Sequence, residues 1–246
     1  MKTTFKKIAL TLIVALSWGG ASFAQANQPG AGNCLQFDGM SNRVLITSSA
    51  AINFNYTNSF SFETWVKNED ITLERRIINK QQNVTNELHI TLGMGSDNGI
   101  NPGMGGRFYF KIGGQNAWAI YAYSTFIANT FDYYHLAGVY DGNTIYLYVN
   151  GILQNFASRG ANTTIVSPAN IQIARLYNNT DYYTGLIDEV RIWNVALTQT
   201  QIRDNMCQKL IGNEAGLVGY WRFDEITGNT AFDSQTNVAP NNGTGF

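Results

Sequence analysis

The acidic residues that could do chemistry in this sequence occur as adjacent pairs. Hydrolysis of a glycosidic bond requires two carboxyl groups that flank the bond, and two acids on a strand share a face when they are two or four residues apart. Asp188 and Glu189 are adjacent, as are Asp224 and Glu225. The chain has two histidines and no Ser/His/Asp or Cys/His arrangement for nucleophilic catalysis. The sequence therefore predicts that the protein is not an enzyme.

Two acids are candidates for a structural calcium site. Asp38 lies in an Asp-Gly turn after the first predicted strand, and Asp188 lies in the last long one. The opening and closing strands of a sandwich tend to meet, so we expect these two carboxylates to approach each other, and like charges at close range need a cation. Calcium with turn carbonyls could supply it. Alternatively, Asp38 only stabilises its turn, and Asp188 pairs with Arg43 or Arg191.

Aromatic residues supply the candidates for carbohydrate binding. Sugar rings stack on exposed aromatic side chains, because an aromatic ring offers an apolar face beside polar groups that bond to hydroxyls. Trp118 lies in one segment with Tyr121 and Tyr123, and Tyr182 follows a loop rich in Asn. We predict that Trp118 and Tyr182 contact the ligand; the alternative is that these rings are part of the core. Three other tryptophans are assigned to the core: Trp65, Trp193 and Trp221.

The N-terminus has the features of a secretion signal. A basic stretch that ends at Lys7 precedes apolar residues 8–16, and the small residues around Ala24 form a cleavage site. We predict a signal peptide at residues 1–24 with cleavage after Ala24, then a polar segment at residues 25–33, and a protein that is secreted or held at the cell surface. No other apolar run approaches about 18 residues, so no membrane insertion is expected.

Cysteine usage agrees with export. The two cysteines, Cys34 and Cys207, both follow the predicted leader. An even number of cysteines in an exported chain favours a disulfide, so we predict that these two are joined. Two separate buried thiols are the alternative. A disulfide would bring the first strand beside a late helix.

Composition indicates many strands joined by tight turns. The chain has 246 residues, of which 44% are hydrophobic, 13% aromatic and 13% charged, with 24 Gly and 4 Pro. Without the leader it is mildly acidic and has no basic run, which excludes nucleic acid as a partner. Short apolar runs recur about every ten residues, the spacing of an all-β sandwich. Strands are predicted at residues 34–37, 43–47, 60–67, 76–80, 88–92, 107–112, 118–123, 133–140, 144–149, 152–156, 171–175, 185–193 and 217–223.

Turn and cap residues mark where elements begin and end. Asp-Gly at residues 141–142 and Asn-Gly at residues 150–151 suit hairpin turns that need positive φ. Thr198 and Gln201 form a capping box, so one short helix is predicted to begin there and to continue to Gly212.

Five blocks of sequence, taken in order, resemble one family. They are LQFDG at residues 35–39, FSFETWVK at 60–67, AGVYDG and LYVNG at 137–151, GLIDEVRIWN at 185–194, and GLVGYWRFD at 216–224. These blocks are similar to the laminin-G-like, concanavalin A-like jelly-roll domains of exported bacterial proteins. The resemblance covers residues 34–246 and implies an all-β, two-sheet antiparallel jelly-roll sandwich with one short late helix.

The resemblance also implies a function. Domains of this family usually bind rather than catalyse, and metal sites recur in related jelly rolls, which supports calcium at Asp38 and Asp188. We expect an exported, non-catalytic binding module whose partner is an extracellular glycan. A protein-adhesion or structural surface module with the same fold is the alternative, its partner a surface protein, and a glycoside hydrolase is disfavoured.

Overall fold

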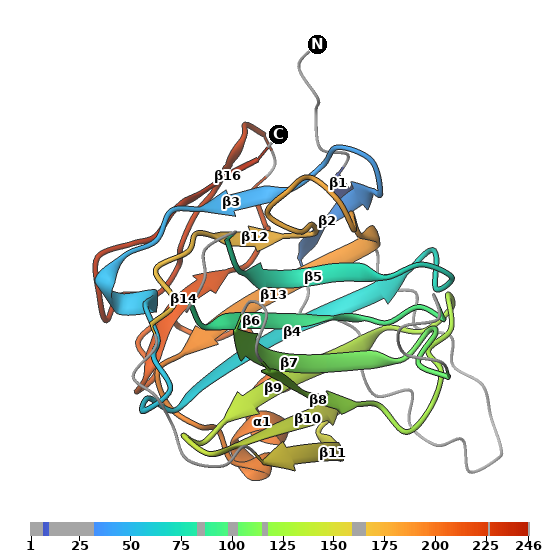
Figure 1. The fold of residues 1–246 in the computed structure, drawn as a ribbon. Helices are drawn as coiled ribbons and strands as arrows, with labels where there is room; N and C mark the ends of the chain where they lie inside the picture. Colours follow the sequence, from blue (N-terminus) through green and yellow to red (C-terminus); the bar gives the residue numbers. More distant parts are fainter. Residues whose placement is uncertain are drawn as a thin grey trace, which may run out of the picture.

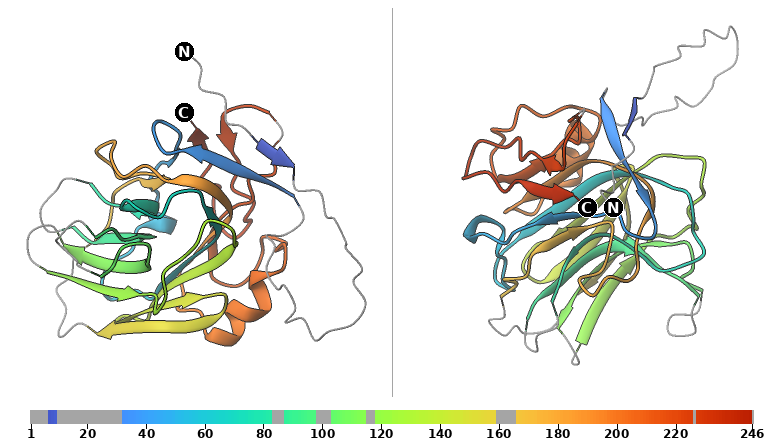
Figure 2. Two further views of the ribbon diagram at one scale, coloured as in Figure 1. Left: turned by 90° about the vertical axis from the view of Figure 1, so that its right-hand side faces the viewer. Right: turned by 90° about the horizontal axis from the view of Figure 1, so that it is seen from above.

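Two antiparallel sheets of eight strands each form a sandwich (Figures 1 and 2). The computed structural model describes residues 7–9, 32–82, 87–97, 103–114, 118–158, 166–225 and 227–245. Sheet A has the order β1 (Lys7–Ala9), β2 (Asn33–Asp38), β13 (Thr184–Trp193), β4 (Phe60–Asn68), β9 (Tyr134–Tyr140), β10 (Thr144–Val149) and β11 (Ile152–Ser158), with β14 (Leu217–Trp221) also paired to β13. Sheet B has the order β15 (Thr230–Ala231), β16 (Gly243–Gly245), β3 (Val44–Ile46), β12 (Ile171–Ile173), β5 (Arg75–Lys80), β6 (His89–Met94), β7 (Phe108–Gly114) and β8 (Trp118–Tyr123). The predicted fold class is confirmed.

The main core fills the space between the sheets. Side chains alternate between the two faces of a regular strand, as the pleat requires. In β7, for example, Phe108, Phe110 and Ile112 are fully buried in this core. Tyr109 and Lys111 therefore lie on the opposite face of sheet B. The same alternation runs through β6, β8 and β12, whereas a bulge in β5 places both Ile77 and Ile78 in the core.

A second apolar cluster lies on the outer face of sheet A. There α1 (Gln199–Met206) and the chain after it cover the strands (Figure 2, left). Thr198 and Gln201 form the predicted capping box. The cluster consists of Ala137, Val139, Trp193, Leu197, Ile202, Leu210, Leu217 and Tyr220. Among the described residues, no helix covers the outer face of sheet B, which is the face turned toward the viewer in Figure 1.

The helix ends at Met206, earlier than the predicted stop at Gly212. Side chains from sheet A donate hydrogen bonds to carbonyl groups at the C-terminal end of the helix. Trp65 Nε1 donates to the carbonyl of Met206 at 2.6 Å, and the Arg191 guanidinium donates to the carbonyls of Asn205 and Gln208. Because these groups satisfy the C-terminal carbonyls, another helical turn is not needed for that purpose.

The two predicted hairpins are present. Asn150 and Gly151 have φ of 52° and 70°, and Gly142 has φ of 100°, so the turn residues adopt the left-handed conformations expected of them. The hairpins join β9 to β10 and β10 to β11. Strand β11 in turn lies beside β8 of the other sheet, at the edge of the sandwich.

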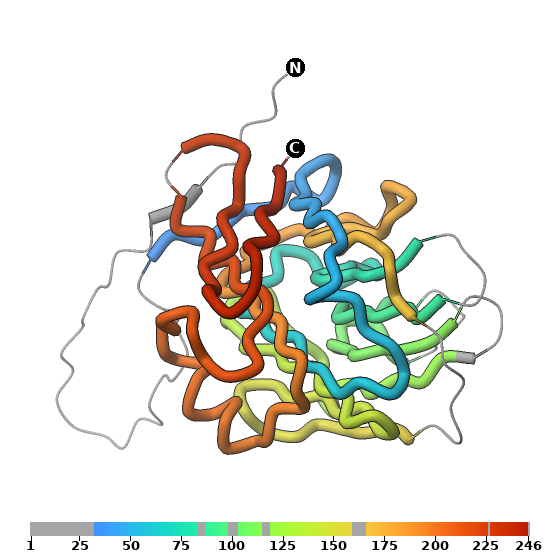
Figure 3. Tube along the Cα trace, turned by 90° about the vertical axis from the view of Figure 1, so that its left-hand side faces the viewer, coloured from blue at the N-terminus to red at the C-terminus, as the bar shows by residue number. Residues whose placement is uncertain are grey.

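The first and last described strands belong to different sheets. The C-terminal β16 lies between β15, the edge strand of sheet B, and β3 (Figure 3). The predicted signal peptide and polar segment lie outside the described residues, apart from β1 and residues 32–33, and β1 pairs with β2. No helix in the described part of the chain is long and apolar enough to cross a bilayer.

Candidate functional site

A row of polar side chains crosses the outer face of sheet B. The register of the strands places Gln172, Asn79, Thr91, Lys111 and Tyr121 side by side on β12, β5, β6, β7 and β8. We call these five residues the polar row. Each one stands between residues whose side chains enter the core, so its own side chain points away from the core.

Three tyrosine rings gather at the β7–β8 end of this face. The rings of Tyr121 and Tyr123 are parallel, with centroids 5.5 Å apart and 6° between their planes. Tyr109 lies 5.9 Å from Tyr121 and 5.7 Å from Tyr123. Tyr109 is buried, whereas the other two rings are half-buried. We call these three residues the tyrosine cluster.

Gly93 makes room for the cluster. It is the cross-strand neighbour of Tyr109 on β6, and a Cβ atom there would lie only 2.9 Å from the Tyr109 hydroxyl oxygen and 2.6 Å from the carbonyl oxygen of Arg75. Tyr109 can therefore lean over β6 until its hydroxyl contacts Arg76 and Glu74.

Charged groups surround the tyrosine cluster. Arg76 forms ion pairs with Glu74 at 2.8 Å and with Asp181 at 3.2 Å. Lys111 Nζ lies 5.3 Å from the centre of the Tyr121 ring. Burial, followed by the nearby charge of Arg76, lowers the pKa of Lys111 to about 8. Next to the cluster, an open hollow of about 330 Å³ is lined by Leu73, Glu74, Arg75, Ser96 and Asp181.

Sheet B contains a buried hydrogen-bond acceptor that has no partner among the described residues. Asn79 is fully buried, and its amide nitrogen donates to Thr91 Oγ1 at 3.0 Å. Among the described residues, nothing donates to its Oδ1 atom. A buried acceptor without a partner costs free energy.

Tyr182 lies at the other end of the same face. It is half-buried and hydrogen-bonded to Arg43. Burial lowers the pKa of Arg43, and the neighbouring guanidinium of Arg175 lowers it further. Arg175 in turn donates to Gln172 Oε1 at 3.1 Å and to Asn179. The predicted contact residue therefore adjoins the polar row through these two arginines.

Three of the tryptophans considered above lie in the core, and Trp118 lies at the start of a strand of sheet B. Trp65, Trp193 and Trp221 are buried, at 1%, 2% and 0% exposed, which confirms that they belong to the core. The backbone of Trp118 begins β8 and pairs with Gly114. The side chain of Trp118 lies outside the described part of the structure, so its contact with a ligand remains a prediction.

The alternation of residue types along β5–β8 was the signal for the rest of the site. Tyr109 and Lys111 alternate with Phe108, Phe110 and Ile112, and Tyr121 and Tyr123 alternate with Ile120 and Ala122. The sequence indicated the segment of Trp118 but not Asn79, Lys111, Arg76 and Arg175, which come from three other parts of the chain: β5, β7 and the residues after β12.

Asp38 and Asp188 do not come together. Asp38 is opposite Thr184 in the pairing of β2 with β13, so Asp188 is four residues further along that strand, about 13 Å away. The strands do meet as expected, but their register separates the two carboxylates. Among the described residues, no group of three or more His, Cys, Asp and Glu side chains is arranged to hold a metal ion. Calcium binding itself remains a prediction.

Asp38 instead holds its own turn together. Its Oδ1 accepts hydrogen bonds from the backbone nitrogens of Met40, Ser41 and Asn42 at 2.9–3.1 Å, and its Oδ2 accepts one from Ser41 Oγ. Burial raises the pKa of Asp38, but these hydrogen bonds outweigh it, so the pKa lies below its usual value.

We expect Asp38→Ala to lower the free energy of unfolding by about 1 kcal/mol at neutral pH, because three backbone donors lose a charged acceptor in an exposed turn. The folded-state pKa is lowered, so this stabilisation is present above the unfolded pKa of about 4 and is lost as the pH falls below it. Urea unfolding of the two proteins with and without a chelator measures it. A chelator effect that disappears in the variant would instead support calcium at Asp38.

Asp188 lies beside Cys34 beneath the chain that follows α1. Asp188 is opposite Trp65 on β4 and is 4% exposed. Burial raises its pKa, and the negative charge of Glu189 raises it further. Burial, followed by the charge of Asp188, raises the pKa of Cys34 to about 12.

Contacts of neighbouring residues link the two segments that carry the cysteines. Cys34 is buried in β2, and Cys207 is the exposed residue that ends α1. Asn33, next to Cys34, donates its backbone nitrogen to Asp224, and Asp224 forms an ion pair with Lys209, two residues after Cys207. These contacts support the predicted disulfide, which remains a prediction.

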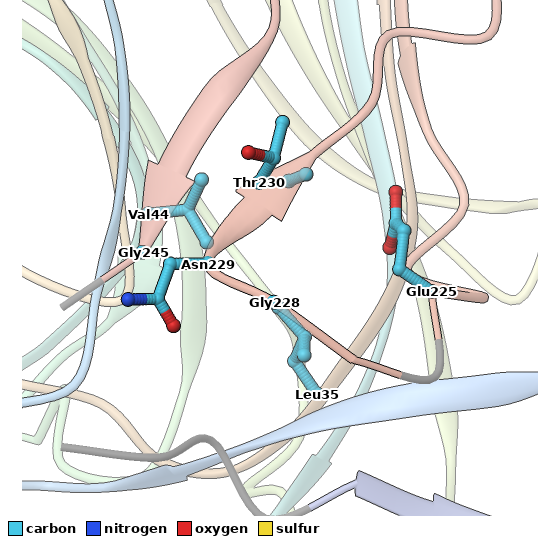
Figure 4. Close-up of a pocket in the computed structure, with 8 residues that line it drawn as sticks. Leu35, Val44, Glu225, Gly228, Asn229, Thr230 and Gly245 are labelled. Carbon is cyan, nitrogen blue, oxygen red and sulfur yellow. The ribbon is translucent and has the colours of Figure 1, made fainter. Parts of the chain in front are cut away.

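Three further acids, Glu63, Glu189 and Glu225, lie in sheet A or beside a small cavity. Glu189 pairs with Arg191 at 2.7 Å, and Glu63 accepts a hydrogen bond from Trp193 at 2.7 Å, both beneath the second apolar cluster. Glu225 accepts a hydrogen bond from the backbone of Phe232. It lines a cavity of about 10 Å³ between β2, β3, β15 and β16 (Figure 4), which has room for about one water molecule.

Glu63 makes stability depend on pH. It is fully buried beside His135 and Arg191. Burial raises its pKa to about 7, against the opposing effects of Arg191 and Trp193. A raised carboxyl pKa means that the folded state holds the proton to higher pH than the unfolded state does. The contribution of Glu63 to stability is therefore greatest below about pH 4 and decreases as the pH rises towards 7.

We expect Glu63→Gln to gain stability relative to the wild type as the pH rises from about 5 to about 8, because glutamine has no proton to lose. The amide oxygen can still accept from Trp193. Burial, followed by the charge of Arg191, lowers the pKa of His135 well below its usual value, which gives a trend of the opposite sign in both proteins. Urea midpoints at both pH values test this, and parallel pH profiles for the two proteins would contradict it.

Comparison with known proteins agrees with the architecture. The family model of the concanavalin A-like lectin/glucanases superfamily matches residues 38–203. The chain belongs to this superfamily. The resemblance inferred from the five sequence blocks is thereby confirmed. Among curated proteins, no relative matches the sequence.

Solved structures of this superfamily's fold include proteins of several kinds. A Bacteroides ovatus protein to which carbohydrate binding is attributed has a TM-score of 0.65 at 20% identity over 87% of this chain, which spans 58% of that protein's length. Domain 4 of a GH43 extracellular arabinanase from Geobacillus stearothermophilus, in complex with arabinotriose, has a TM-score of 0.56 at 20% identity over 72% of this chain and 77% of its own. The binding domain of botulinum neurotoxin serotype G has a TM-score of 0.54 at 17% identity, with coverages of 72% and 43%. At these identities the likeness shows the fold.

Proposed function

We propose that this protein is an exported, non-catalytic binding module whose ligand is an extracellular carbohydrate. The observation that carries the proposal is the outer face of sheet B, where the tyrosine cluster adjoins the polar row and no described helix covers either. Rings offer apolar faces for a sugar, and the half-buried hydroxyls of Tyr121 and Tyr123 and the ammonium group of Lys111 offer hydrogen-bonding groups for its hydroxyls. The solved structures described as carbohydrate-binding support the same class of ligand.

The proposal is tested by retention of the purified protein in affinity gels that contain plant, algal and bacterial polysaccharides in turn. Retention by at least one polymer, together with no increase in reducing ends after long incubation, is the expected result. Release of oligosaccharides by the pure protein would contradict the non-catalytic assignment. No retention on any polymer of the panel would contradict carbohydrate binding.

Protein adhesion is the second candidate, and one observation favours it. The edge strand β11 exposes Ile152, Leu153 and Phe156 at 56%, 40% and 59%, and exposed apolar side chains that cluster on an edge often mark a protein contact. Adhesion to cells that is lost in Phe156→Glu, with no retention by any polysaccharide, would favour this function over the first.

A further inference from the structure

Two cations on the outer face of sheet B have only neutral partners among the described residues. Lys111 lies between Thr91 and Tyr121 in the polar row and over the Tyr121 ring. Arg175 is 5% exposed and donates to the amide oxygens of Gln172 and Asn179. In the described part of the chain, no carboxylate oxygen lies within 4.0 Å of either one.

This lack of acidic partners is local to the polar row. At the rim of the same face, Arg76 pairs with Glu74 and Asp181, and Arg75 pairs with Asp70. The whole chain has a net charge of −1, so an excess of basic residues does not explain the two unmatched cations. A partly buried cation without an anionic partner costs free energy, and a bound anion would reduce that cost.

The unpartnered Oδ1 atom of Asn79 lies between these cations. Asn79 is next to Gln172 in the polar row and two strands from Lys111, which is about 10 Å at the usual strand spacing. On this face Lys111 and the rings of Tyr121 and Tyr123 are half-buried and can be reached by a ligand, whereas Asn79 and Arg175 are 0% and 5% exposed. A sugar that carries a carboxylate or a sulfate presents both an anionic group for Lys111 and an apolar surface for the rings.

We propose that the ligand of this face is an acidic glycan, whose carboxylate or sulfate groups bind Lys111 while its sugar rings contact the tyrosine cluster. The inference rests on the proposed function and adds the class of carbohydrate. Its recognition would be charge-assisted, so binding should weaken as salt is added.

The test compares polymers that differ only in charge. Polygalacturonate is compared with its methyl ester, and a sulfated galactan with its desulfated form, in affinity gels run with the full protein. We expect the protein to bind at least one acidic polymer about tenfold more tightly than its neutral counterpart, which is the usual effect of one charge-assisted contact. The two pairs show whether carboxylate or sulfate is preferred.

Lys111→Gln should remove most of that preference, because it lowers binding to the acidic polymers much more than binding to the neutral ones. Lys67→Gln is the matched control, because Lys67 also lies over a tyrosine ring, that of Tyr133 at 5.5 Å, but on sheet A. We expect this control to bind as the wild type does. Unfolding midpoints of both variants verify that each one is folded.

A pH profile gives a readout that a purely structural role of Lys111 would not change. Binding of the wild type to the acidic polymer should weaken as the pH rises through about 8, the pKa of Lys111, and Lys111→Gln should lack this step. Arg76, Glu74, His89 and Tyr121 are the other titratable or charged groups around it. Burial lowers the pKa of His89 to about 4 and raises that of Tyr121, so neither loses a proton near pH 8.

The outcomes separate this inference from the proposed function. Equal binding of charged and neutral polymers, or an acidic preference that survives in Lys111→Gln, would overturn the acidic ligand and leave carbohydrate binding in place. No retention on any polymer, charged or neutral, would overturn both.

Discussion

Replacement of both Tyr121 and Tyr123 by alanine is expected to weaken polysaccharide binding by about 100-fold. Each ring offers an apolar face, and contacts with an aromatic ring contribute about 1.5 kcal/mol, so the loss of both corresponds to roughly 3 kcal/mol, or two factors of ten. The rings are half-buried on an uncovered face, so the fold should survive their loss. Dissociation constants from affinity gels measure the effect.

Two controls make this result specific to the rings of this face. Replacement of both tyrosines by phenylalanine retains the rings and removes only the hydroxyls, so binding should fall by much less than in the alanine variant. Phe156→Ala removes a ring that is 59% exposed on β11 of sheet A, and its binding should equal that of the wild type. If the alanine double variant still binds as the wild type does, the site lies elsewhere.

Removal of the predicted disulfide is expected to lower the free energy of unfolding by about 5 kcal/mol, which corresponds to roughly 10–20 °C in Tm. The bond would close a loop of about 170 residues, and in the chain-entropy model the longest loops give the largest effects. It would also tie β2, at one side of sheet A, to the end of α1, where the contacts of Asp224 with Asn33 and Lys209 already bring the two segments together.

The measurement compares the wild type with a variant that carries both Cys34→Ala and Cys207→Ala. Reductant should destabilise the wild type to about the level of the variant and should have no effect on the variant itself. Peptide mapping without reductant should recover residues 34 and 207 in one linked fragment. Two alkylated thiols in the exported protein would contradict the bond.

Local features of the chain were enough to predict the fold class. Strict alternation in β7 and β8, the positive-φ turn residues Gly142, Asn150 and Gly151, and the capping box at the start of α1 act over a few residues each. Their physical causes are the pleat, the sterics of glycine and asparagine, and the unpaired donors at a helix start, all of which can be read from neighbouring residues.

Contacts between distant segments decided where the helix ends. The residue pattern after Met206 is compatible with a helix up to Gly212, and the sequence therefore predicts that the helix ends there. In the structure, Trp65 and Arg191 from sheet A donate hydrogen bonds to the carbonyl groups at the end of the helix. These partners are far away in the chain, so no local rule could have located the end at Met206.

The register of the paired strands determines which functional side chains lie next to one another. The expectation that β2 and β13 pair was right, yet the register that sets Asp38 opposite Thr184 leaves Asp188 beside Cys34. The same kind of long-range pairing set Gln172, Asn79 and Lys111 in one row, although they lie in strands separated by up to about 90 residues of sequence. The alternation within each strand tells which face a residue occupies, because the pleat has a period of two, but only the packed sheet, with hydrogen bonds between distant strands, determines its neighbours on that face.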